Sequence, residues 1–264
     1  ERQSWKCRPM RELDVTNDKE AFFTNNEDGY PIYNHLNIGH FAFEESAGAF
    51  NYTDFENAIG LLQTKRKRIW GNKNSAFTSL PREWSLDLST LPALNPRIAF
   101  RDVIHAGNER KVWASLVPSQ TILTNTAPYF IFSQGGVREQ AFVLGLLNSS
   151  ILDWIGHTKI NLHLNYFILN SFPMPEMLAD AKTSRFIELS AGLAIAGSTL
   201  DRFGNWPDLA DPIRENERPE AIAELDAIAS LLYELPDEFI KTIWNKPTRP
   251  EPELIRTYRA KWRD

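Results

Sequence analysis

The residues of this sequence that could do chemistry are mainly cations and amides. Four consecutive cations stand at positions 65–68, and Trp70, Asn72 and Lys73 follow them. Neighbouring like charges repel one another unless they are solvated or lie against anions. Trp70 offers a stacking surface, and Asn72 carries an amide that can pair with the edge of adenine. The segment predicts contact with DNA phosphates and bases, with an ordinary solvated surface as the alternative.

A pair of arginines further along the chain has two possible roles. Arg97 and Arg101 are four residues apart on a strand-like run, so we expect them on the same side of it. Each could bind guanine or phosphate through two parallel hydrogen bonds. Each could instead brace a carboxylate such as Asp102 inside the fold, and the pattern favours this brace. Arg110 has the same two possible roles.

The remaining candidates are side chains that flank turns. We expect His105 and Lys111 to face solvent or DNA. For His163 a structural imidazole is favoured, and a contact with a base edge or with the DNA backbone is the alternative. The residues predicted to contact DNA are Lys65, Arg66, Lys67, Arg68, Asn72, Lys73, Arg97, Arg101, His105, Arg110, Lys111 and His163.

Apolar runs predict the elements that position these side chains. Residues 137–155 contain no proline and are apolar on nearly every face, which predicts one long buried helix ended by Gly156. Residues 161–169 are predicted to return to a strand, and residues 18–23 to form a short helix. Short apolar runs bounded by Gly, Asn and Pro, as in strands, lie at 98–100, 112–117 and 129–132.

Helical spacing dominates the last third of the sequence. Apolar residues recur at helical intervals within 183–196 and 222–232, and Pro219 stands where a helix would begin. The fold class predicted is therefore α+β: a mixed β-sheet core with a buried helix, followed by a helical C-terminal subdomain.

The order of several short motifs resembles the C-terminal target-recognition domain of type IIG restriction–modification enzymes and related N6-adenine DNA methyltransferases. The resemblance extends over roughly residues 29–244. The motifs that carry it are Arg-Ile-Ala-Phe-Arg-Asp at 97–102, Asn-Glu-Arg at 108–110, Leu-Val-Pro at 116–118, Leu-Leu-Asn-Ser at 146–149, Asn-Tyr-Phe-Ile-Leu at 165–169 with Pro-Met-Pro at 173–175, and Glu-Leu-Asp-Ala-Ile to Leu-Tyr at 224–233.

The resemblance implies a division of the chain and of its labour. Residues 1–28 would connect to an absent upstream domain, residues 29–176 would form the target-recognition core, and residues 177–264 would form a helical subdomain packed on it. The partners would be double-stranded DNA and the upstream methyltransferase domain, with or without a nuclease. S-adenosylmethionine would bind that absent domain, and no cofactor is expected in this fragment. Methylation of an amine within a duplex requires base flipping, which is the catalytic domain's task.

The sequence predicts no catalytic or metal site of its own. Cys7 is the single cysteine, which excludes a cysteine-rich zinc site and is typical of a reducing cytoplasm. Residues 125–130 lack the first proline of the Asn-Pro-Pro-Tyr/Phe motif that holds a flipped adenine, and an extra residue intervenes. The Gly-Gly pair at 135–136 is typical of an ordinary turn.

Charge is distributed unevenly along the chain, whose net charge is −5. Residues 61–114 carry 10 basic and 4 acidic groups, whereas residues 1–60 carry 5 and 11. One face that meets phosphates would produce this pattern. No apolar run reaches membrane-spanning length, and a cytoplasmic location is expected. The alternative function is a protein-interaction scaffold whose acidic helical tail binds a partner; a free-standing enzyme is disfavoured.

Overall fold

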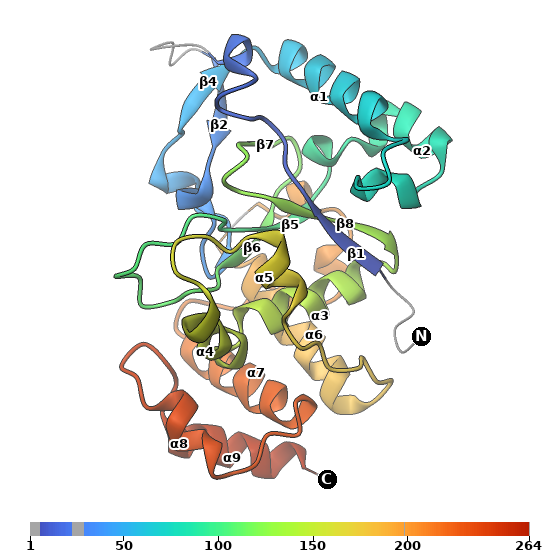
Figure 1. Ribbon diagram of the computed structural model, residues 1–264. Helices are drawn as coiled ribbons and strands as arrows, with labels where there is room; N and C mark the ends of the chain where they lie inside the picture. The colour runs from blue at the N-terminus through green and yellow to red at the C-terminus, as the bar shows by residue number, and fades with distance from the viewer. Residues whose placement is uncertain (1–5, 23–28, 198, 264) are drawn as a thin grey trace.

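The computed structural model describes residues 6–22, 29–197 and 199–263, and their fold is α+β as predicted. A central mixed sheet lies in the middle of the molecule, with α1 above it and most of the other helices below (Figure 1). Its strand order is β1-β8-β5-β6-β3, in which β3 runs parallel to β6 and the other neighbours are antiparallel. The strands are β1 (Lys6–Met10), β3 (Phe41–Ala42), β5 (Arg97–Phe100), β6 (Ala114–Val117) and β8 (Tyr129–Gln134).

Both faces of the central sheet are covered, which explains why its inner strands are apolar without alternation. Ile98 and Phe100 face one hydrophobic cluster, which also holds the helices below. Ala99 and Val117 face a second cluster on the opposite side. The three short apolar runs of the sequence are thus strands, with β6 beginning two residues later than the predicted run.

A smaller upper layer holds the cationic helix. Its sheet has the order β4-β2-β7, and a third hydrophobic cluster, which includes Ile59 and Leu62, joins it to α1. Asp54 begins α1, because its carboxylate accepts a hydrogen bond from the Asn57 amide at 2.8 Å. The upper elements are β2 (Tyr30–Tyr33), β4 (Asn51–Thr53), β7 (Ile122–Leu123), α1 (Phe55–Ile69) and α2 (Arg82–Leu86).

The buried helix predicted for residues 137–155 is two helices. The chain turns at Ser149, whose backbone is extended and whose hydroxyl accepts a hydrogen bond from the Leu152 amide at 3.3 Å. Gly156 lies inside the second helix and does not end it. Burial is confirmed, since all eight residues from Ala141 to Asn148 are buried. The two helices are α3 (Val137–Asn148) and α4 (Ser150–Lys159).

The strand predicted for residues 161–169 is also wrong. A single β-bridge joins His163 to Val103, and the chain then forms the short helix α5 (Tyr166–Asn170). The side chain of Asn165 accepts a hydrogen bond from the Ile168 amide at 2.9 Å, so a capping residue begins the helix where the apolar pattern predicted a strand.

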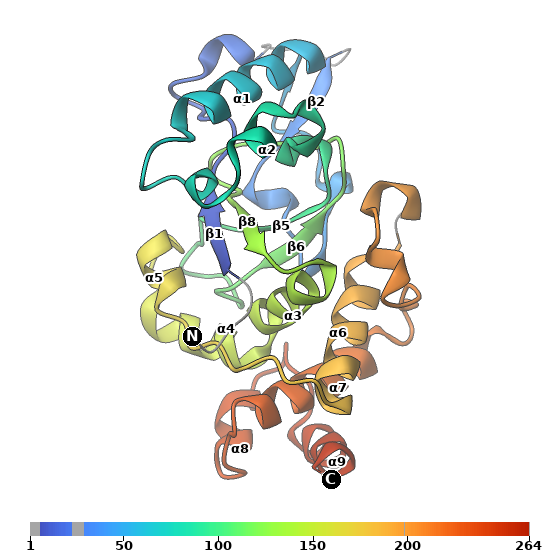
Figure 2. The same ribbon diagram turned by 90° about the vertical axis from the view of Figure 1, so that its right-hand side faces the viewer.

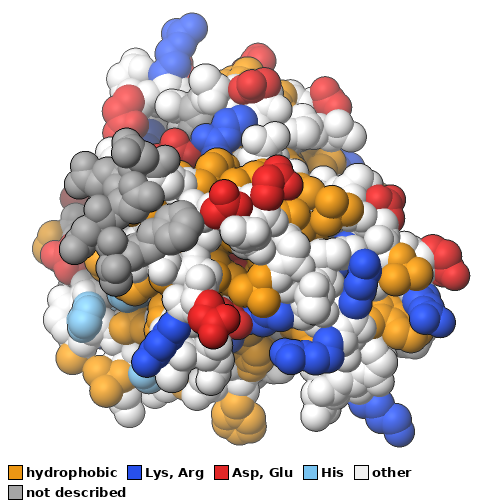
Figure 3. Space-filling model, turned by 90° about the horizontal axis from the view of Figure 1, so that it is seen from above, with side chains coloured by type: hydrophobic (Ala, Val, Ile, Leu, Met, Phe, Trp, Pro, Cys, Tyr) orange, Lys and Arg blue, Asp and Glu red, His pale blue; other side chains and the backbone are white. Residues whose placement is uncertain are grey.

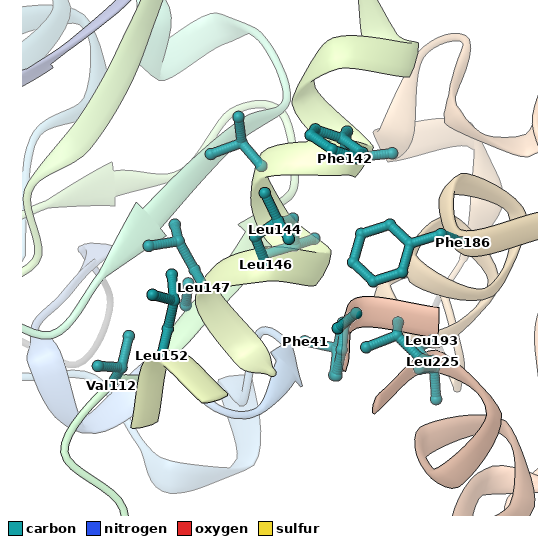
Figure 4. Close-up of a cluster of buried hydrophobic side chains, with 14 of the residues drawn as sticks. Phe41, Val112, Phe142, Leu144, Leu146, Leu147, Leu152, Phe186, Leu193 and Leu225 are labelled. Carbon is teal, nitrogen blue, oxygen red and sulfur yellow. The ribbon is translucent and has the colours of Figure 1, made fainter. Parts of the chain in front are cut away.

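The C-terminal part of the chain is helical, as predicted, but it shares its core with the sheet. Phe186 lies 5.5 Å, ring centre to ring centre, from Phe142 of α3 (Figure 4). The largest hydrophobic cluster therefore continues across residue 176. The helices are α6 (Ala181–Ala194), α7 (Arg218–Leu232), α8 (Phe239–Trp244) and α9 (Pro252–Trp262).

The described part of the predicted connector belongs to the fold. Residues 6–10 are β1, the edge strand of the central sheet, and Glu12 and Leu13 are buried. The short helix predicted at residues 18–23 is a 3-10 turn over Lys19–Ala21, and Phe23 lies outside the described residues. None of the described helices has the length and apolarity needed to cross a membrane.

Candidate nucleic-acid interface

The second half of α1 presents the exposed cations of the predicted run. Lys67 and Arg68 are exposed and have no hydrogen-bond or ion-pair partner within the described chain. Asn72 and Lys73 are exposed on the loop that follows. The Asn72 side chain accepts a hydrogen bond from the Asn74 amide at 2.9 Å, so this loop has a defined shape.

Arg66 does not take part in this surface, which corrects its prediction as a DNA contact. Its side chain is buried and donates to the Gln63 side chain at 2.9 Å and to the Asp87 carbonyl oxygen at 2.8 Å. Its guanidinium also lies 5.0 Å from the ring centre of Trp84. Arg66 therefore holds α1 against the following segment.

Lys65 lies at the flank of the exposed face and joins α1 to the N-terminal segment. Its ammonium group donates to the Glu12 carbonyl oxygen at 2.9 Å and pairs with Asp18 at 2.5 Å. The side chain is partly exposed at one flank of α1, and its charge is compensated by Asp18, so its position is fixed.

A second group of side chains is gathered around the buried carboxylate of Asp102. Arg11 pairs with it at 2.6 Å, and His163 approaches its other oxygen at 3.3 Å. The Arg11 guanidinium also lies 5.2 Å from the ring centre of Tyr166 in α5, which lies beside β1 (Figure 2). The Arg11 and His163 side chains remain about half exposed, at 45% and 59%. Asp102 thus orients two donors at the surface without being exposed itself.

Arg11 connects the two groups of side chains. It precedes Glu12, whose carbonyl oxygen binds Lys65, and it shares a small cavity lining with Lys65 and Arg66. The surface therefore continues from α1 through Arg11 to His163 and α5. We call the exposed side chains of Lys65, Lys67, Arg68, Lys73, Arg11 and His163 the basic track.

An exposed aromatic ring lies next to the α5 end of the basic track. Phe167 is 85% exposed, and Leu162, which precedes His163, is 58% exposed. These two side chains contribute little to the core and are available for contact at this end of the surface.

Two of the predicted DNA contacts on the central sheet are engaged inside the fold. Arg97 pairs with buried Glu12 at 2.6 Å and donates to the Thr121 carbonyl oxygen, which confirms the brace but identifies Glu12 rather than Asp102 as its carboxylate. Arg101 is half-buried. Its guanidinium lies 4.4 Å from the ring centre of Trp113 and donates to the Ile38 backbone oxygen. The expectation that Arg97 and Arg101 approach the same side is confirmed by these contacts.

Arg110 and Lys111 are buried, which corrects the predicted exposure of Lys111 and, of the two roles open to Arg110, favours the one inside the fold. Arg110 donates to the Asn148 carbonyl oxygen at 2.7 Å. The Lys111 ammonium donates to the backbone oxygens of His105 and Ala106, so it fixes its own loop. His105 is exposed, as expected.

The 101–113 loop does not lie beside the end of α1. In Figure 1 the loop extends to the left below the upper layer, whereas α1 ends at the upper right. The single phosphate-facing surface that the charge of residues 61–114 predicted is therefore wrong, because residues 65–68 and 105–111 lie apart. Arg11, which follows β1, lies next to the flank of α1 instead.

Acidic groups are absent from the segment that supplies most of the basic track. From Asn57 to Arg82 the sequence has six cations and no Asp or Glu. In the view from above, lysine and arginine side chains gather toward the lower right of the face (Figure 3). A surface with several unpaired cations attracts polyanions and releases their counterions on binding.

Buried ionisable groups join the core to the helical tail behind this surface. Asp226 accepts hydrogen bonds from the Ser150 amide and hydroxyl and from the Trp244 indole, and burial raises its pKa. Burial, with Arg110 nearby, holds the pKa of His40 well below its ordinary value, so its ring is neutral near pH 7. These groups stabilise the scaffold and do not face the basic track.

Sequence reasoning missed Arg11, Tyr166 and Phe167 as surface groups. Arg11 falls in the predicted connector, and Tyr166 and Phe167 fall in the predicted strand. The Asn165 cap was the one available signal for α5. The part of the chain that the structure describes contains no group of three or more His, Cys, Asp or Glu side chains able to hold a metal ion.

A scan of family models and a search of curated proteins found no match for the sequence.

Proposed function

We propose that this chain is the DNA-recognition module of an N6-adenine DNA methyltransferase of the type IIG restriction–modification kind, and that it binds a specific duplex sequence. The motif order supports the family, and the basic track supports DNA as the ligand. In this proposal the methyl transfer and the S-adenosylmethionine belong to a catalytic domain elsewhere in the parent protein.

One observation carries the proposal: a rigid helix end presents unpaired cations in a stretch that has no acidic residue. Lys67 and Arg68 have no partner among the described residues, although the chain as a whole is acidic. Retaining like charges side by side destabilises an isolated surface, and phosphates on a ligand would remove this cost. Asn72, on the loop that follows these cations, has an exposed amide of the kind that contacts bases.

Salt dependence tests this function directly. We expect the purified protein to bind short duplexes with an affinity that falls steeply as salt rises, and the variant with Lys67→Gln, Arg68→Gln and Lys73→Gln to bind more weakly. The slope of log affinity against log salt should decrease by about 0.9 for each phosphate that the variant no longer neutralises. Fluorescence anisotropy with a pool of duplexes with randomised centres measures both quantities.

A matched variant separates local contact from total charge. Neutralising Lys182, Arg214 and Lys241, which lie in the helical tail, changes the net charge equally. This control should leave the slope unchanged. The proposal is rejected if both triple variants and the unsubstituted chain give equal slopes of log affinity against log salt. It is also rejected if the unsubstituted chain binds no duplex at low salt.

A scaffold function is the alternative, and a groove in the helical tail favours it. The groove is about 440 Å³ in volume and is lined by Glu188, Glu217 and Glu220, with Tyr258 at its side. Acidic walls beside an aromatic ring suit a basic peptide. In that case duplex DNA would not bind at any salt concentration, and a Lys/Arg-rich peptide would.

A further inference from the structure

The exposed face of α1 has an unusual composition for a solvated helix. At 3.6 residues per turn, Asn57, Gly60, Thr64, Lys67 and Arg68 share one stripe, and all five are exposed. The opposite side of the helix is buried in the upper layer. The stripe changes from small residues in its first half, with the exposed Glu56 at its edge, to cations in its second half.

Gly60 has no packing role in the fold. A Cβ added to Gly60 would meet nothing within 4 Å. Every other glycine within a described α-helix has a neighbour that a Cβ would crowd: Phe186 at 2.7 Å for Gly145, Val112 at 3.0 Å for Gly156, and a backbone oxygen at 2.8 Å for Gly192. Glycine is among the least favourable residues in a helix interior, so Gly60 lowers the stability of α1 and leaves its surface open to close approach.

Thr64 is prepared for an apolar contact on the same stripe. Its hydroxyl donates to the Gly60 carbonyl oxygen at 2.9 Å. The hydroxyl is thereby engaged with the helix backbone, and the methyl group is left for an outside contact. Thymine, with its C5 methyl in the major groove, is a partner of that kind.

We propose that α1 lies in the major groove of duplex DNA, with Asn57, Gly60 and Thr64 toward the base edges and Lys67 and Arg68 on the flanking phosphates. This inference rests on the proposed DNA-recognition function and names the element and the groove. Fifteen residues give a helix of about 22 Å, and the groove is about 12 Å wide and accepts one helix. The cations and the phosphates are complementary in charge.

The fold holds α1 rigidly enough for this role. Asp54 caps its first turn, and Gln63 donates to the Leu86 carbonyl oxygen at 3.1 Å. Arg66 and Lys65 tie its last turns to the Asp87 and Glu12 carbonyl oxygens. A helix fixed on its buried side presents its stripe without further ordering, which favours specific contacts.

Adding a side chain to Gly60 tests close approach. Gly60→Met places a helix-favouring residue in open space, so the thermal midpoint should rise or stay the same. The reference ligand is the duplex that the unsubstituted chain selects from the randomised pool. If α1 enters the groove, the variant should bind this duplex about tenfold more weakly or worse, because a long side chain holds the helix away from the bases. Ala260→Met, on an exposed position of α9, is the matched control and should bind like the parent.

The outcomes separate this inference from the proposed function. If Gly60→Met binds the selected duplex as tightly as the parent, major-groove docking of α1 is wrong. If the Lys67, Arg68 and Lys73 variant is nevertheless weakened, the DNA-recognition function stands without it. If the parent binds no duplex, both fail together.

The groove itself can be probed from the DNA side. Replacing guanine by 7-deazaguanine and adenine by 7-deazaadenine in the selected duplex removes major-groove acceptors and leaves the minor groove intact. We expect this change to weaken binding, and we expect netropsin, which occupies the minor groove, not to compete. Competition by netropsin without an effect of the deaza bases would overturn the assignment.

Discussion

At the scale of single residues, the partner of each cation decides what it can do. Arg66 and Arg97 belong to motifs that predict DNA contacts, yet both are buried with protein acceptors. Lys67 and Arg68 have no such acceptors in the described chain. The positively charged surface of this protein is therefore smaller than its sequence indicates, and it is also more localised.

The buried pair of Asp153 and Arg249 allows a prediction on pH. Both side chains are 1% exposed and lie 2.5 Å apart. Burial raises the pKa of Asp153, but Arg110, the Lys111 amide and Arg249 outweigh it, so the pKa lies below its ordinary value of 3.8. A carboxylate with a lowered folded-state pKa stabilises the fold above its unfolded-state pKa, and this contribution is lost as pH falls through the folded-state pKa.

Asp153→Asn should therefore destabilise the protein by about 3 to 5 kcal/mol near neutral pH, because Arg249 stays buried without a counter-charge. The difference in unfolding free energy between parent and variant should shrink as pH falls below about 4. Urea unfolding at several pH values measures it. Glu188→Gln, at an exposed ion pair with Arg185, should change stability little, and a pH-independent destabilisation in Asp153→Asn would contradict the assignment.

At the scale of elements, the apolar patterns of the sequence predicted the buried strands but missed the residues that cap helices. The runs at 98–100 and 129–132 lie in strands whose two faces are both covered. Such strands are apolar throughout, so apolar content alone predicts them. The break at Ser149 and the helix after Asn165 depend on hydrogen bonds that short side chains accept from backbone amides, which an apolar pattern does not encode. Both residues are nonetheless typical helix caps and could have been recognised.

The candidate site was only partly predictable for a related reason. Lys67, Arg68 and Lys73 are visible in the sequence because cations cluster there. The acceptors that bury Arg97 and Arg110 lie 85 and 38 residues away from them along the chain. Arg11 and His163 both contact Asp102, and the three residues come from three separate segments of the chain. Contacts over such separations follow from the fold and cannot be read from local spacing.

Two helical glycines should respond oppositely to one substitution. Gly145→Ala would place a Cβ 2.7 Å from the ring of Phe186, which is fully buried and cannot move away, so we expect a destabilisation of about 1 to 3 kcal/mol. Gly60→Ala meets nothing and should stabilise the protein by up to about 1 kcal/mol. Thermal unfolding followed by circular dichroism compares the two, and changes of the same sign would contradict the packing described for α1 and α3.

At the scale of the whole molecule, one hydrophobic cluster joins the sheet to the helical tail. Phe41 of β3, Leu146 of α3 and Leu225 of α7 belong to it (Figure 4). Asp226 adds polar contacts between α7 and the start of α4. The boundary at residue 176 therefore separates regions of different composition, while the two regions share a core.

A shared core predicts a shared unfolding transition. Phe186→Ala should cost about 3 to 5 kcal/mol, because removal of the ring leaves a cavity between α3 and α6. Slowly exchanging amides of β6 and of α7 should become less protected together, by a similar factor. Hydrogen exchange followed by mass spectrometry reports both segments at once. Reduced protection in α7 alone would mean that the tail unfolds as a separate unit.

The upper layer is different, because α1 packs on a hydrophobic cluster of its own. Ile59 and Leu62 contact residues of β2 and β7 there, separately from the cluster that unites sheet and tail. Substitutions along the outward side of α1 would thus leave the common core untouched. If α1 selects the bound sequence, new target preferences can evolve through a few exposed positions, at little risk to the folding of the protein.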